Sequence, residues 1–238
     1  MWGATGLKLL RGDPALEELV ARFAGAYVPP PRTTTDELRE THRPKGRAPS
    51  HGWPVVVALH GNNSTLALER GHWMAANGAG WAVELLQSVV PSWVPGFAVW
   101  DDDALAERQI RDAVTRLRAE RDIDGSRVVV AGYSAGGYRA VQHVLKPDAL
   151  TRTVVAMAAW LPAEVAETMA ADAADLASVR AYLLVGELDA SRAGHALLAS
   201  RVSAAGGTCV VEERPGMGHT FPGDFGHALV RALAEVEA

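Results

Sequence analysis

The sequence predicts an α/β protein built on a mostly parallel, doubly wound sheet of about six strands flanked by helices. Three observations predict it. From residue 54 onward, short apolar runs alternate with helical patterns. The runs are apolar nearly throughout, as in strands that are covered on both faces. Hydrophobic residues make up 48% of the chain, which suits a globular domain with a substantial core.

Six runs are predicted strands, and each is followed by a predicted helix. Ligands of parallel sheets bind at the carboxyl ends of the strands, so functional residues are expected directly after these runs. The strands are 54–60, 81–86, 127–132, 153–159, 181–185 and 208–212, and the helices are 66–77, 104–121, 135–146, 163–175, 191–204 and 223–237.

The first 50 residues have a different character. Apolar residues recur at helical spacing from Leu16 to Tyr27 and predict an amphipathic helix over 14–26. A proline-rich stretch and a basic, loop-like stretch follow it. We expect residues 1–50 to form a helical arm and linker that could mediate homo-oligomerisation. Residues 51–238 form the α/β domain that carries the chemistry.

Composition excludes several classes of partner and location. The net charge is −5 and no basic stripe stands out, so we expect no nucleic-acid partner. No apolar run approaches the roughly 20 residues of a membrane span. Cys209 is the single cysteine, so no intrachain disulfide can form, and the first ten residues lack the layout of a secretory signal. We expect a cytoplasmic protein.

The third strand ends in the motif G-x-S-x-G, at Gly132-Tyr133-Ser134-Ala135-Gly136. Such a motif between a strand and a helix is typical of a nucleophile elbow, in which a tight turn projects the serine hydroxyl. The flanking glycines remove Cβ atoms that would clash in so tight a turn. The alternative is an ordinary glycine-rich turn. A phosphate-binding loop is disfavoured because the segment lacks the required lysine.

An acid and a histidine follow two later strands. Asp189 lies after the fifth strand and His219 after the sixth, so both should meet Ser134 at one edge of the sheet. Glu187 is the alternative acid. The rivals of His219 as general base lie in predicted helices and are weaker candidates: His143, His195 and His227.

The loop after the first strand, His60-Gly61-Asn62-Asn63, is a candidate oxyanion-binding loop. We expect the backbone N–H of Asn62, or next Asn63, to act with that of Ala135. His60 is expected to be a structural hydrogen-bonder. The candidates for the substrate pocket are Asn63, Tyr133, Trp160 and Trp100, and core packing is the alternative for both tryptophans.

Acidic residues elsewhere do not suggest a metal site. Asp101, Asp102 and Asp103 precede a helix, and capping explains at least one of them. Asp and His residues are scattered among loops without the spacing of metal ligands. We therefore expect no metal and no cofactor.

Residues 54–238 resemble the α/β-hydrolase superfamily. The segments "LHGNNST", "WDD", "GYSAGG", "VGELD" and "GMGHTFP" are similar to those of predicted esterases in its phospholipase/carboxylesterase or dienelactone-hydrolase-like branch. The resemblance implies Ser134, Asp189 and His219 as a catalytic triad, with Asn62 and Ala135 as oxyanion donors. It also implies a core without a large cap domain, and only about 20 residues separate the fourth strand from the fifth. The usual first two antiparallel strands are not evident.

The functional hypothesis is a serine hydrolase that cleaves a small-molecule carboxylic ester through an acyl-enzyme intermediate. Other acyl transfer at the same triad, by a thioesterase, peptidase or acyltransferase, is the first alternative. A non-catalytic binding protein that retains the fold is the second. A hydrolase whose role is set by partner docking through residues 1–50 is the third.

Overall fold

The computed structural model describes residues 39–237, together with 14–15, 18 and 22. Most of the predicted helix over 14–26 and of the predicted arm therefore lies outside the described residues. The division of the chain at residue 50, and assembly through the arm, stay predictions.

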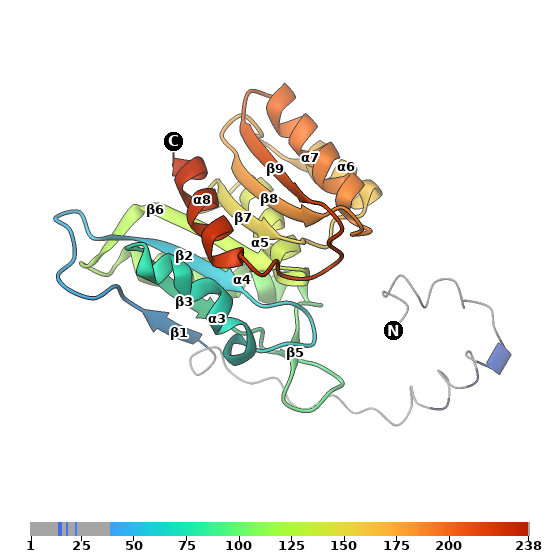
Figure 1. The fold of residues 1–238 in the computed structure, drawn as a ribbon, viewed down its shortest axis with the longest axis horizontal. Helices are drawn as coiled ribbons and strands as arrows, with labels where there is room; N and C mark the ends of the chain where they lie inside the picture. Colours follow the sequence, from blue (N-terminus) through green and yellow to red (C-terminus); the bar gives the residue numbers. More distant parts are fainter. Residues whose placement is uncertain (1–13, 16–17, 19–21, 23–38, 238) are drawn as a thin grey trace. The chain divides into compact units, whose positions relative to one another are not determined.

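A seven-stranded sheet forms the centre of the described part, in the order β1-β3-β2-β6-β7-β8-β9 (Figure 1). Six of the strands are parallel, and β1 pairs with β3 in the antiparallel direction. The strands are β1 (Arg39–His42), β2 (Trp53–Leu59), β3 (Ala82–Leu86), β6 (Ile123–Tyr133), β7 (Thr153–Met157), β8 (Arg180–Gly186) and β9 (Thr208–Arg214).

All six predicted strands are present, and the predicted fold class is confirmed. The six predicted helices also form, each displaced by a few residues at most. They are α3 (Leu66–Gly78), α4 (Asp103–Arg118), α5 (Ala135–Leu145), α6 (Ala163–Asp172), α7 (Arg192–Ala204) and α8 (Phe225–Glu237). A short antiparallel pair of two-residue strands, β4 (Val90–Pro91) and β5 (Ala98–Val99), was not predicted.

The seventh strand, β1, lies inside the segment that the sequence assigned to the arm and linker. Its sequence, Arg39-Glu40-Thr41-His42, contains no apolar residue, so hydrophobic patterning could not reveal it. All four residues are half-buried. Charged side chains on an edge strand also oppose edge-to-edge association, so a polar sequence suits this position.

The sheet is covered on both faces because successive strand residues point to opposite sides. In β2, Val55, Val57 and Leu59 pack into the core shared with α4, α5, α6 and α7. The alternate residues Val56 and Ala58 pack against α3 and α8. Both faces of β2 are therefore buried, as its continuous apolar run predicts.

The strand order reverses direction between β2 and β6. From β2 the chain moves to β3 on one side, and from β6 it continues to β7, β8 and β9 on the other side. Such a switch point leaves a crevice at the carboxyl ends of the two strands, where open α/β sheets bind ligands. In the described part of the chain, no helix is both long and apolar enough to cross a membrane.

Candidate active site

Ser134 occupies the corner between β6 and α5 at this switch point. Its backbone has φ 53° and ψ −117°, a conformation that residues other than glycine rarely adopt. Hydrogen bonds hold the corner on both sides. The Ser134 N–H donates to Met157 O at 3.0 Å, and its carbonyl accepts the Trp160 N–H at 3.0 Å. The surrounding strands therefore impose the strained turn that projects the hydroxyl.

Two glycines of the motif are required by close backbone contacts. A Cβ on Gly132 would collide with the backbone of Gly136, on the opposite side of the turn. A Cβ on Gly136 would collide with the carbonyl of His60. The first helical turn of α5 thus packs directly against the 60–63 loop, which brings that loop beside Ser134.

His219 lies between Ser134 and Asp189. The Ser134 hydroxyl donates to His219 Nε2 at 2.8 Å, and His219 Nδ1–H donates to Asp189 Oδ2 at 2.7 Å. Because an ionised carboxylate only accepts hydrogen bonds, the Asp189 contact places the imidazole proton on Nδ1 and leaves Nε2 as the acceptor. Nε2 can therefore receive the hydroxyl proton.

Asp189 is held in its ionised form despite being buried. Burial acts to raise the pKa of this carboxyl, but hydrogen bonds from His219 and from the Ser191 N–H outweigh it and lower the pKa below its usual value. The Ser191 N–H donates to the second oxygen, Oδ1, at 2.8 Å. The alternative acid Glu187 is exposed and accepts instead from the Gly216 N–H at 2.7 Å.

The backbone N–H groups of the 60–63 loop differ in whether they have an acceptor. The Gly61 N–H donates to Glu69 Oε1 at 2.8 Å, and the Asn63 N–H donates to Ala98 O at 2.9 Å. The Asn62 N–H has no recorded acceptor within the described residues. Its side chain is held on both ends, since Oδ1 accepts from the Trp100 N–H at 2.7 Å and Nδ2 donates to Asp101 at 3.0 Å.

The second candidate donor is the Ala135 N–H. Ala135 is the first residue of α5, and the first N–H groups of a helix have no acceptor within that helix. The dipole of α5 also favours negative charge at this end. Two donors on different elements therefore border the serine.

Four other histidines, namely His60 and the three rivals of His219, are not part of this chain of hydrogen bonds. His60 is buried; its Nε2 accepts the Ser88 N–H at 3.1 Å, and burial lowers its pKa to about 4. His143 lies buried against Glu107, with Nδ1 3.1 Å from the carboxylate. His195 Nδ1–H donates to Ser191 O at 2.8 Å. His227 is exposed on α8.

The candidate pocket residues have different environments. Trp160 is 38% exposed and packs edge-on against Tyr138, with ring centroids 5.7 Å apart. Trp100 is 2% exposed, and its indole N–H donates to His60 O at 2.7 Å. It supports the 60–63 loop from the core. The Tyr133 hydroxyl donates to His219 O at 3.0 Å, and Asn63 Oδ1 accepts from the Ser92 hydroxyl.

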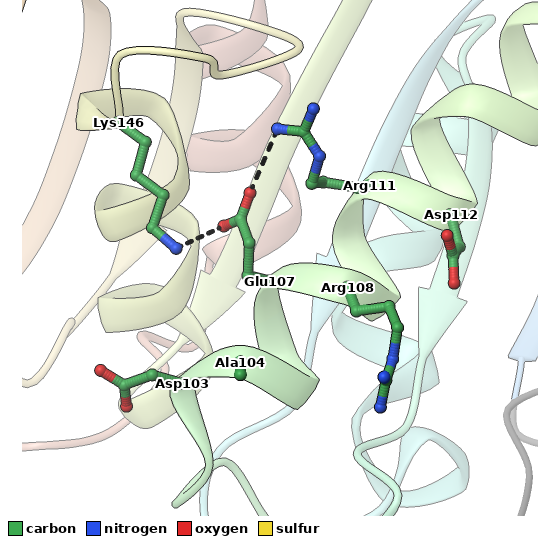
Figure 2. A pocket seen from close by; sticks show the side chains of 7 residues that line it. All are labelled: Asp103, Ala104, Glu107, Arg108, Arg111, Asp112 and Lys146. Atoms are coloured by element: carbon green, nitrogen blue, oxygen red, sulfur yellow. Dashed lines mark ion pairs between the residues drawn. The ribbon is translucent and has the colours of Figure 1, made fainter.

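A separate open depression lies between α4 and the end of α5 (Figure 2). Ion pairs dominate it, because Lys146 and Arg111 both approach Glu107, at 3.1 Å and 3.6 Å. Lys146 directly follows the carboxyl end of α5 and Ser134 directly precedes its first residue, so the two lie about 18 Å apart along the helix. The depression is lined by Asp103, Ala104, Glu107, Arg108, Arg111, Asp112 and Lys146.

Asp102 and Asp103, at the start of α4, cap and brace the helix. Asp102 is the N-cap, accepting from the Leu105 N–H at 2.9 Å, and Asp103 pairs with Arg139 at 2.5 Å. Within the described residues, no three His, Cys, Asp or Glu side chains gather as metal ligands would.

A model of one enzyme family matches residues 97–234, which span more than half of the chain and include Ser134, Asp189 and His219. The chain belongs to the dienelactone hydrolase family. The family is part of the α/β-hydrolase superfamily, in agreement with the resemblance of the sequence motifs. No curated protein matches the sequence.

Solved structures share the fold at low sequence identity. An uncharacterised protein from Bacillus cereus ATCC 10987 superimposes with a TM-score of 0.68 at 18% identity, over 83% of this chain and 64% of that protein. Esterase 2 of Thermogutta terrifontis with bound propionate superimposes with a TM-score of 0.65 at 19% identity, over 84% of this chain and 86% of the esterase. The same esterase phosphorylated by paraoxon has a TM-score of 0.64 at 16% identity, over 85% of this chain and 89% of the esterase.

Glu69 is a residue near the site that the sequence motifs did not identify. It lies in α3, eight residues after Gly61, and belongs to no motif. One signal was available. The buried positions of α3 are Glu69, Trp73 and Ala76, so a carboxylate occupies the apolar face of a helix. A buried charge needs a specific partner, which is itself a reason to examine such a residue.

Proposed function

We propose that this member of the dienelactone hydrolase family is a serine esterase with Ser134, His219 and Asp189 as its catalytic triad. The observation that carries the proposal is the continuous chain of hydrogen bonds from the Ser134 hydroxyl through His219 to Asp189. The strained corner and the lowered pKa of Asp189 support it, as does the Asn62 N–H, which has no acceptor in the described part of the chain.

In the acylation step, Ser134 Oγ attacks the carbonyl carbon of the ester while His219 Nε2 takes the hydroxyl proton. Asp189 stabilises the imidazolium and keeps its ring oriented. The N–H groups of Asn62 and Ala135 bind the oxyanion. When the carbon–oxygen bond to the alcohol breaks, His219 returns the proton to the leaving alkoxide.

In the deacylation step, water attacks the acyl group on Ser134. His219 removes a proton from the water and then gives it to Ser134 Oγ as the acyl bond breaks, which releases the carboxylic acid. No metal or organic cofactor takes part in this sequence.

We assign short-chain esters as the substrate class. The segment between β7 and β8 holds α6 and adds no cap that could enclose a long chain. The backbone N–H of Trp160 donates to Ser134 O, which holds this residue beside the nucleophile. The Thermogutta terrifontis esterase 2 structures with bound propionate and butyrate are consistent with this assignment.

Hydrolysis of p-nitrophenyl butyrate by Ser134→Ala tests the proposal. Loss of a triad serine lowers kcat by about 10⁴–10⁶-fold, because both covalent steps are removed. Ser126→Ala is the matched control, since Ser126 is exposed near the amino end of β6 and its hydroxyl donates to Asp124. Ester, thioester and amide analogues of the same acyl group then distinguish an esterase from other acyl-transfer enzymes. Full activity in folded Ser134→Ala would contradict the assignment.

A further inference from the structure

In the 60–63 loop the N–H groups of Gly61 and Asn63 are bound, whereas that of Asn62 has no acceptor among the residues that the structure describes and is available to a substrate. Asn63 has φ 55°, a left-handed conformation, and its N–H is bound to Ala98 O. The Gly61 N–H points away to Glu69. The direction of the Asn62 N–H therefore depends on how firmly its two neighbours are held.

Glu69 is buried, with 6% of its surface exposed, and comes from the first turn of α3. Its Oε1 accepts the Gly61 N–H at 2.8 Å, and this bond is itself buried. Gly61 is confined on two sides. A Cβ at this position would lie 2.8 Å from the Tyr133 ring and 3.4 Å from Glu69 Oε1. The peptide is thus enclosed between an aromatic ring and a carboxyl group.

Among the residues that the structure describes, no cation contributes to the pKa shift of Glu69. Burial raises its pKa to about 7, and the Gly61 N–H and the Ser64 hydroxyl oppose that rise. Tyr133, from β6, is the titratable neighbour, and burial and Glu69 together raise its pKa to about 12. A carboxyl group kept here without an ion-pair partner is costly, so its hydrogen bond to the loop is the contact that accounts for it.

We propose that Glu69 is the positioning residue of the oxyanion-binding loop: by holding the Gly61 N–H, it directs the Asn62 N–H toward the substrate oxygen at Ser134. The inference rests on the proposed esterase function. Glu69 touches neither substrate nor the reacting atoms and acts through the loop. Its effect should therefore fall on transition-state stabilisation, and much less on binding of an uncharged ester.

The test compares Glu69→Gln, which keeps an acceptor oxygen, with Glu69→Leu, which has none. Fluorophosphonate labelling to completion counts the competent active sites, so that kcat can be expressed per site. KM is measured for the ester. The inhibition constant of a trifluoromethyl ketone, which forms a tetrahedral adduct with the serine, reports on binding of the oxyanion. We expect Glu69→Gln to stay within about threefold of wild type. We expect Glu69→Leu to lose about 10²-fold in kcat, as when an oxyanion donor is removed, with KM nearly unchanged. Ketone affinity should fall in parallel with kcat.

Glu84 provides the matched control. It is another fully buried glutamate, on β3, paired with Arg116 and Thr41 away from the loop. Glu84→Leu should lower the melting temperature while leaving kcat per labelled site unchanged. A Glu69→Leu enzyme with lowered stability but wild-type kcat per site would overturn the proposal.

A measurement on folded, ¹⁵N-labelled protein covers the case in which Glu69→Leu does not fold. The Gly61 amide proton should shift as pH passes through the Glu69 pKa of about 7, and the shift should be absent in Glu69→Gln. A Gly61 resonance that does not titrate in wild type would overturn the proposal. If Ser134 fails to label while Gly61 titrates, the esterase assignment fails and the hydrogen bond stands.

Discussion

At the residue scale, the proposed chemistry depends on which carboxylate touches His219. Sequence order placed both Glu187 and Asp189 after the same strand, and order alone could not separate them. In the structure Asp189 is buried and bonded to His219, whereas Glu187 is exposed and bonded to Gly216. The two carboxylates are two residues apart and face different partners.

Exchanging each carboxylate for its amide tests this difference. Asp189→Asn keeps one acceptor oxygen, which the Ser191 N–H binds, and turns an NH2 donor toward His219 Nδ1. The imidazole proton then moves to Nε2, so kcat should fall by about 10⁴-fold. Glu187→Gln keeps an acceptor for the Gly216 N–H and should stay within about threefold. Steady-state kinetics of both purified variants checks the prediction. A larger loss in Glu187→Gln would mean that the acid role belongs to Glu187.

Glu69 makes a prediction about stability against pH. Its pKa rises from 4.5 in the unfolded chain to about 7 in the fold, so the folded state holds the proton more tightly. Its contribution to the free energy of unfolding is therefore fully present below pH 4.5 and is lost as pH rises through about 7. The free energy of unfolding changes by about 3 kcal/mol between these limits. Glu69→Gln should melt higher than wild type at pH 8, with the gap closing by pH 5. If the melting temperatures of the wild type and of Glu69→Gln depend on pH in the same way, the prediction is contradicted.

At the scale of elements, the segment after β7 borders the proposed substrate site, and we infer that it limits the size of the acyl group. Trp160 is fixed by its N–H bond to Ser134 O and packs against Tyr138 of α5. Methylenes that extend past an indole into water gain none of the roughly 0.8 kcal/mol available per buried CH₂. The short β7–α6 connection and this ring therefore favour a small acyl group.

A panel of p-nitrophenyl esters graded by acyl length tests Trp160. We predict that kcat/KM of the wild type peaks at about two to four carbons, where the chain still contacts the indole. Trp160→Ala should move the optimum to longer chains. If the ring serves only core packing, the melting temperature falls and the profile keeps its shape. A wild-type preference for chains of ten carbons or more would contradict the assignment.

The attachment of β1 depends on charge. Glu84, on the neighbouring strand, is fully buried and pairs with Arg116 of α4, and Thr41 donates to it at 2.5 Å. Arg43, directly after β1, pairs with Glu120 and Asp122. Polar side chains from three elements therefore fix the strand that apolar patterning could not predict.

Arg116→Met should leave Glu84 buried without its cation. Breaking a buried pair in this way costs about 3 kcal/mol, which corresponds to roughly 5–10 °C in melting temperature for a domain of this size. The proposed active site is untouched, so kcat per labelled site should not change. Adding Glu84→Leu should restore part of the loss. An unchanged melting temperature in Arg116→Met would show that the pair contributes little.

At the scale of the whole molecule, the sheet and the triad geometry share one cause. Parallel strands with apolar sequences end at one edge, so residues that follow three different strands converge there. This is why strand order alone could bring Ser134 and His219 together with an acid after the fifth strand, while the contact with His219 distinguishes Asp189 from Glu187. Asn62 could be proposed for the same reason.

Other features were beyond the sequence because they depend on packing. The strand β1 has no apolar residue, and charge pairing fixes it to the sheet. Trp100 and Trp160 look alike in the sequence, yet one supports a loop from the core and the other is partly exposed. The hydrogen bond from the Gly61 N–H to Glu69 belongs to no motif, and the buried face of α3 is its one signal in the sequence.

The central claim is that Ser134 is the nucleophile, and covalent labelling tests it most directly. The wild-type protein is treated with a fluorophosphonate, digested, and mapped by mass spectrometry, with Ser134→Ala and Asp189→Asn treated alongside. We predict a single adduct on the peptide that contains Ser134, its absence in Ser134→Ala, and a much slower reaction in Asp189→Asn. An adduct on another serine, or a folded wild-type protein that does not label, would contradict the account.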